Sequence, residues 1–208
     1  MAFSFNGTSS YIESTSTPVT GVPFTMACWV KSSVTNQSKT IMYLGNSATT
    51  SRFELNIASN IFSLAAGAGG PTTSANSSIS VGNEIWYHVA GVCISPTSRF
   101  IFVNGATKVQ NTTSRTPLGI NNITLGAQIL SSTRGAFFGG TIAEAAIWNE
   151  ALTDDQILSL QKGFSPYFIQ PTNLKFYNRC IRTSQDLYGG LNLTSANLSV
   201  VDHPRIYG

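Results

Sequence analysis

One stretch decides the fold of this 208-residue chain: FFGGTIAEAAIWNEALTDDQILSLQKG, which runs from Phe137 to Gly163. Its first part alternates with period two, which predicts a strand over residues 137–148. One face of this strand would carry Ile142, Glu144 and Ala146, and the other Thr141, Ala143, Ala145 and Ile147. A short helix is expected directly after the turn at Asn149-Glu150.

This helix has clear start and stop signals. Thr153 is the expected N-cap, and Gln156 three residues later completes a capping box. Leu152 before the cap can pack on Ile157 as a hydrophobic staple. Gly163 fits the left-handed position that closes a helix. Because the chain shows almost no other helical period, we interpret this helix as the element that closes a β-sandwich, without a catalytic role.

Other strand candidates recur along the chain, separated by polar turns. Asn104-Gly105 is a type I′ hairpin signal, and the glycine-rich run Gly67–Pro71 predicts a loop. That run lacks the Gly-Lys-Ser/Thr ending of a phosphate loop, so nucleotide binding is not expected. Many short strands indicate antiparallel sheets packed face to face. The candidate strands are 24–31, 41–44, 52–57, 61–65, 86–94, 99–103, 108–111 and 123–125.

Six short motifs in order carry a resemblance to the laminin-G-like (concanavalin A-like) jelly-roll family. They are Phe5-Asn6-Gly7 with Ser10-Tyr11-Ile12, Phe24 to Lys31, Trp86 to Ala90, Phe102 to Gly105, Ile123 to Gly126, and Gly140 to Ile157. The resemblance covers about residues 1–163. It implies an all-β fold, namely a two-sheet antiparallel jelly-roll sandwich with one short helix and a C-terminal arm.

We therefore predict a jelly-roll domain over residues 1–166 and a C-terminal extension over residues 167–208. About 40 residues are few for an independent core, so this arm is expected to pack on the domain or on a neighbouring subunit. The sequence leaves that choice open. The arm also resembles the tails of small stand-alone laminin-G-like proteins of bacterial viruses.

The composition limits the classes of function. Only 10% of the residues are charged and the net charge is +3, which is too small and too scattered for a nucleic-acid partner. A charge-poor surface is typical of a protein packed against other subunits, and it would also suit a secreted, glycosylated protein. No signal peptide or membrane span is recognised. Three cysteines, Cys28, Cys93 and Cys180, favour buried free thiols and synthesis in a reducing cytosol.

Catalysis is not expected, and no catalytic, cofactor-binding or metal-ligating residue is assigned. A glycoside hydrolase on this fold would need paired carboxylates on one strand face, whereas Glu144 is the lone acid of its strand. His88 is interpreted as a hydrogen-bonded strand residue, and His203 lies in the arm. Neither has a nucleophile nearby in sequence or a cluster of ligands at metal spacing.

Two kinds of binding stay open. Relatives in this family bind calcium through loop aspartates, but Asn6 stands where they usually have Asp, so no cofactor is expected beyond a weak Ca²⁺ site. Sugar sites in the family use loop amides and a stacked aromatic ring. The candidate aromatic residues are Tyr43, Tyr87, Phe137 and Phe138, each of which is also a normal core residue. Seven Asn-x-Ser/Thr sequons are present, at Asn6, Asn36, Asn76, Asn111, Asn122, Asn192 and Asn197.

The sequence therefore predicts a non-catalytic virion structural protein, namely a capsid decoration or surface appendage of a bacteriophage. Its partners would be capsid or other virion subunits, including copies of itself as a homo-oligomer, and neither nucleic acid nor a membrane. It would be made in the host cytoplasm and located on the virion surface. The alternative is a carbohydrate-binding, lectin-like module for cell-surface or extracellular glycans.

Overall fold

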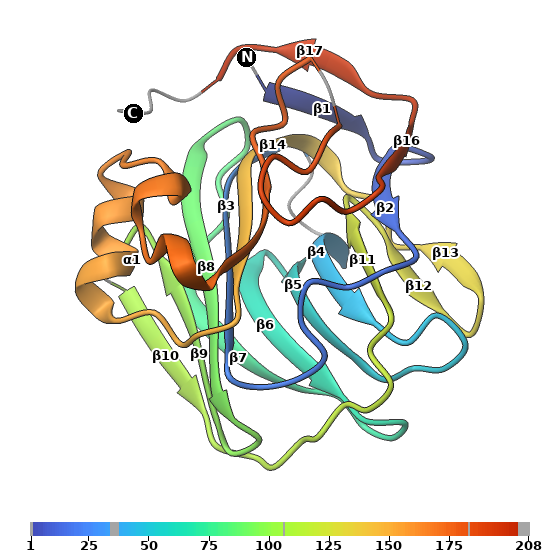
Figure 1. Ribbon diagram of the computed structural model, residues 1–208, viewed down its shortest axis with the longest axis vertical. Coiled ribbons are helices and arrows are strands. Elements are labelled where there is room, and N and C mark those ends of the chain that lie inside the picture. The colour runs from blue at the N-terminus through green and yellow to red at the C-terminus, as the bar shows by residue number, and fades with distance from the viewer. Residues whose placement is uncertain (1, 34–37, 106, 183, 204–208) are drawn as a thin grey trace.

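The computed structural model describes residues 2–33, 38–105, 107–182 and 184–203. Two large antiparallel sheets form a sandwich, which confirms the predicted jelly roll (Figure 1). Sheet A has the order β10 (Thr107–Asn111), β9 (Ser98–Val103), β8 (Trp86–Ser95), β3 (Phe24–Ser32), β14 (Gly139–Trp148), β1 (Ala2–Asn6) and β17 (Ser199–Val201), with β15 (Leu174–Asn178) also paired to β14. Sheet B has the order β16 (Thr194–Ala196), β2 (Tyr11–Ser14), β11 (Asn122–Leu125), β4 (Lys39–Gly45), β5 (Arg52–Ala58), β6 (Ile61–Gly67) and β7 (Thr73–Ser80).

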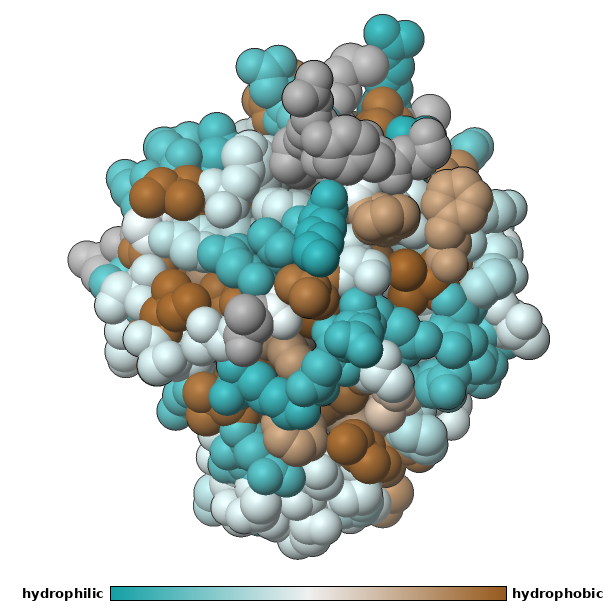
Figure 2. Space-filling view, turned by 90° about the vertical axis from the view of Figure 1, so that its left-hand side faces the viewer, coloured by the Kyte–Doolittle hydropathy of each residue, from teal (hydrophilic) through white to brown (hydrophobic). Residues whose placement is uncertain are grey.

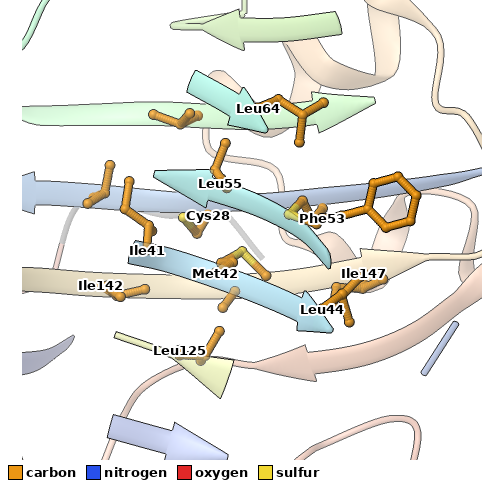
Figure 3. Packing of buried hydrophobic residues seen from close by; sticks show 14 of the residues in the cluster. Cys28, Ile41, Met42, Leu44, Phe53, Leu55, Leu64, Leu125, Ile142 and Ile147 are labelled. Carbon is orange, nitrogen blue, oxygen red and sulfur yellow. The ribbon is translucent and has the colours of Figure 1, made fainter. Parts of the chain in front are cut away.

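The main hydrophobic core lies between the two sheets. Figure 3 shows side chains of β3 and β14 meeting those of β4, β5, β6 and β11, with Cys28 among them. Alternate residues of each strand point inward, as period-two patterning requires. The three cysteines are free and buried, as predicted, and burial raises the pKa of the Cys28 and Cys93 thiols. They act in the core as small apolar groups.

The strict alternation predicted for β14 is wrong at its centre. A bulge lies between Ala143 and Ala146 in the pairing with β3, and Glu144 adopts φ = 53°. The extra residue shifts the phase of the side chains. Ile142 therefore shares the inter-sheet core with Ala145 and Ile147, whereas Ala146 faces the other side of sheet A. Glu144 consequently belongs to the face covered by the C-terminal half of the chain.

A second apolar cluster lies on that outer face of sheet A, beneath α1 (Asp154–Gln161). The predicted capping box is present, because Thr153 and Gln156 each accept a backbone hydrogen bond from the other. Leu152 and Ile157 are both buried in this cluster, and Gly163 closes the helix with φ = 93°. The helix thus covers the sheet as expected, and this side of the molecule mixes separate brown apolar patches with teal hydrophilic and pale neutral groups (Figure 2).

The C-terminal segment pairs with both sheets. It contains the 3-10 turns η1 (Pro166–Phe168) and η2 (Pro171–Asn173), followed by β15, β16 and β17. In Figure 1 the red strands β16 and β17 run beside the blue strands β2 and β1, and their backbone pairing agrees. The described part of the segment therefore packs on its own domain. Leu174 and Phe176 of β15 are fully buried.

Sequence patterning found most of the strands but missed several. β7 was missed because its sequence, TSANSSIS, is almost entirely polar, with Ile79 as its one large apolar residue beside the small buried Ala75 and Ser77. The hairpin of β12 (Gln128–Leu130) and β13 (Thr133–Gly135) was missed as well. The strand expected to begin at Phe137 begins at Gly139. Asn104 and Gly105 both have positive φ between β9 and β10, as the hairpin signal predicted.

Candidate functional site

A polar pocket of about 450 Å³ lies beside sheet B, where the hairpin β12–β13 meets the ends of β2 and β11. We call it the hairpin pocket. Its volume is within the range of small-ligand sites. Its lining residues are mainly hydroxyl and amide side chains from four parts of the chain: Glu13, Ser14, Thr15, Ser47, Asn121, Asn122, Ile129, Ser132 and Arg134.

The hairpin that forms one wall is firmly attached to sheet B. Ser131 and Ser132 form its two-residue turn with φ of 47° and 63°, as a type I′ turn requires. Their backbone N–H groups donate to Thr49 O at 3.0 Å and to Ser47 O at 2.6 Å. The hydroxyl of Tyr43 on β4 also donates to the carbonyl of Ile129. These bonds hold the wall in place over the sheet.

The pocket contains one ion pair in a fixed position. Arg134 Nη2 on β13 donates to Glu13 Oε2 on β2 at 2.6 Å. The same guanidinium lies over the ring of Tyr11, with 3.9 Å between its central carbon and the ring centroid. Tyr11 and Glu13 point to one face of β2 because they are two residues apart. The strand thus supports the arginine with both a ring and a carboxylate.

Two polar atoms of the lining residues lack hydrogen-bond partners within the described part of the chain. They are Asn122 Oδ1 and Arg134 Nε, and both are shielded from water. Asn122 is only 4% exposed. A buried polar group without a partner costs about 1–3 kcal/mol, so such atoms need an explanation. Both residues line the hairpin pocket, whose volume and polar lining make it the strongest candidate for a binding site.

A second polar cluster lies on the outer face of sheet A and is closed. The buried Glu144 accepts a hydrogen bond from the Tyr177 hydroxyl, and lies 2.9 Å from His203 Nε2 and 3.8 Å from Arg179 Nε. Burial, reinforced by Glu144, raises the pKa of Tyr177. The adjoining cavity measures only about 10 Å³, enough for about one water molecule. We therefore interpret this cluster as structural.

The aromatic residues named as candidates for stacking on a sugar do not form a sugar-binding surface. Tyr43 and Phe138 are fully buried and Tyr87 is nearly so, which confirms that these three are core residues. Phe137 is partly exposed but does not line the hairpin pocket. The aromatic ring beside the pocket is that of Tyr11, which the sequence analysis did not single out.

The structure also places the residues considered for metal binding and catalysis. Asn6 Oδ1 accepts hydrogen bonds from the backbone N–H groups of Thr8, Ser9 and Ser10, so this oxygen stabilises the turn that follows Asn6. His88 is buried against the Trp29 ring, and its backbone N–H donates to the Asn104 side chain. Its ring atom Nδ1 has no hydrogen-bond partner among the described residues. Burial lowers the pKa of His88 to about 3.

Sequence reasoning did not find the hairpin pocket. Glu13 and Arg134 are 121 positions apart, and neither belongs to a motif. The one local signal was the Ser131-Ser132 pair between two short segments able to form strands.

No group of three or more His, Cys, Asp or Glu side chains in the described ranges is arranged to hold a metal ion. No helix among the same residues has the length and apolar character needed to cross a membrane.

The fold and the polar pocket define a jelly-roll domain of the class that includes lectins and glucanases. The chain belongs to the concanavalin A-like lectin/glucanases superfamily, whose profile matches residues 6–158. A comparison with curated protein sequences finds no match.

Similar solved structures share the fold at low sequence identity. A candidate carbohydrate-binding protein from Bacteroides ovatus aligns with a TM-score of 0.70 and 20% identity, covering 95% of this chain and 58% of that one. The CBM40 of a Ruminococcus gnavus sialidase, bound to α2,3-sialyllactose, aligns with a TM-score of 0.63 and 16% identity, covering 77% and 95%. A heptameric pentraxin from Limulus polyphemus aligns with a TM-score of 0.62 and 16% identity, covering 77% and 81%.

Proposed function

We propose that this chain is a carbohydrate-binding domain that holds a glycan in the hairpin pocket. The observation that carries the proposal is the pocket itself, whose lining offers hydroxyl, amide, carboxylate and guanidinium groups within about 450 Å³. Sugar hydroxyls both donate and accept hydrogen bonds, so they match a wall of this composition.

The similar structures favour this reading over the viral one. Two of the three described above are a candidate carbohydrate-binding protein and a carbohydrate-binding module with its sugar bound. None of the three is a virion protein, so the capsid or appendage role stays a prediction from the sequence. Catalysis is not part of the proposal, because Glu13 and Glu144, which lie on different sheets, are each engaged by a basic side chain.

The test is binding of the purified chain to a glycan array, followed by calorimetry with the glycans retained. Thr15→Trp should abolish binding, because Thr15 is an exposed residue of the pocket wall and indole would fill the space. Thr20→Trp is the matched control, since Thr20 is exposed but lies outside this wall. Thermal unfolding should show both variants folded. Retention of no glycan, or equal binding by Thr15→Trp and the native chain, would refute the assignment.

A further inference from the structure

The charges of the hairpin pocket cancel within the pocket. Its nine lining residues include one acid, Glu13, and one base, Arg134, and the remaining side chains are uncharged. The two charged groups are bonded to each other at 2.6 Å. No unpaired positive group in the lining is therefore available to a negatively charged ligand.

The arginine is also held in a geometry that disfavours anion binding. Guanidinium groups bind carboxylates best with two parallel N–H donors on one edge. Nη2 of Arg134 is already used by Glu13, and the plane of the group lies over Tyr11. A ligand carboxylate that bound the edge carrying Nη2 would compete with Glu13 for that nitrogen, and displacing Glu13 would leave a protein carboxylate unpaired in a place where its side chain is 18% exposed.

A neutral ligand meets no such penalty. A sugar hydroxyl can donate to the Glu13 carboxylate while a neighbouring hydroxyl accepts from Arg134, so the ion pair remains intact. Glu13 is fixed for this role because its strand β2 pairs on both sides, with β11 and with β16. A carboxylate on the ligand would instead lie beside Glu13, and like charges in contact are strongly unfavourable.

Building on the proposed glycan-binding function, we propose that the pocket selects uncharged sugars and that Glu13 sets this selection. The probes are matched pairs of sugars in which a hydroxymethyl group is replaced by a carboxylate: galactose and galacturonate, and glucose and glucuronate. For the pair that binds, the native chain should prefer the neutral member by at least about tenfold at pH 7 and 0.1 M salt.

The variant that tests the residue is Glu13→Gln, which removes the negative charge and keeps the shape. It frees the charge of Arg134, so the neutral-to-acidic affinity ratio should fall by about tenfold or more. Glu84→Gln is the control, because Glu84 pairs with Lys31 at 3.0 Å outside the pocket and should leave the ratio unchanged.

The outcomes are separable. A native chain that binds both members equally, or prefers the acidic one, overturns the selection while leaving glycan binding intact, and this result needs no variant. A neutral preference that Glu13→Gln leaves unchanged overturns the role of Glu13. If the chain binds no glycan at all, the proposed function and this inference are refuted together. A neutral preference that collapses in Glu13→Gln and survives in Glu84→Gln supports both.

Discussion

The hydrogen bond from the Tyr177 hydroxyl to Glu144 should contribute measurably to the stability of the fold. Tyr177→Phe removes one donor from a carboxylate that is only 3% exposed, with almost no change in side-chain volume. Hydrogen bonds to charged groups contribute about 1.5–3 kcal/mol. Glu144 keeps its contacts with His203 and Arg179, so we expect a loss of about 2 kcal/mol, near the lower half of that range.

The measurement is equilibrium unfolding in urea at pH 7. The dependence of the free energy of unfolding on urea concentration should be the same in the variant and the native chain. For a chain of this size the same loss lowers Tm by about 4–8 °C. Tyr167→Phe is the matched control, because Tyr167 packs edge-on against Tyr188 and is about half exposed. It should change stability by less than about 0.5 kcal/mol. If Tyr177→Phe changed the free energy of unfolding as little as Tyr167→Phe, the Glu144 cluster would not stabilise the fold as argued.

Two further predictions concern the core and the helix. Because burial lowers the pKa of His88 from 6.5 to about 3, the unfolded chain binds a proton between these pH values that the folded chain does not. The free energy of unfolding should therefore fall as the pH drops below 6.5, by up to about 1.4 kcal/mol per pH unit from this group. His88→Phe should remove this part of the pH dependence, as measured by urea unfolding at pH 7, 6 and 5. An unchanged slope would contradict a neutral buried imidazole. Thr153→Ala deletes half of the capping box and should cost about 1 kcal/mol, whereas the exposed Thr20→Ala should cost almost nothing in the same assay.

The sequence predicted those features that short segments determine by themselves. The helix was placed correctly because its cap, its first turn and its closing glycine lie within about ten residues of each other. Most strands of the two sheets were found because each is a short run rich in apolar and β-branched residues between polar turns. The family resemblance then supplied the arrangement of these strands into a jelly roll.

The features that were missed depend on distant parts of the chain. The bulge at Glu144 interrupts a run of alanines that reads as regular, and it is stabilised from outside, since the Glu144 N–H reaches Arg179 O at 3.4 Å. The hairpin pocket likewise exists only when β2, β11 and the hairpin come together. An arginine and a glutamate with no motif around them gave no local sign of it. Composition led us to expect no catalytic site, but it could not indicate where a binding pocket would lie.

The pairing of β16 and β17 with β2 and β1 governs the order in which this fold can be completed. Ser10 Oγ donates to the carbonyl of Asn197 across 187 positions. Joining such distant segments is the slowest part of folding for a sandwich, because the entropy cost of closing a long loop comes before the stabilising contacts form. Until then β1 and β2 present bare backbone at the rim of each sheet, where a second chain could attach. Once closed, those rims end in strands of three residues, too short to recruit a neighbour by backbone pairing.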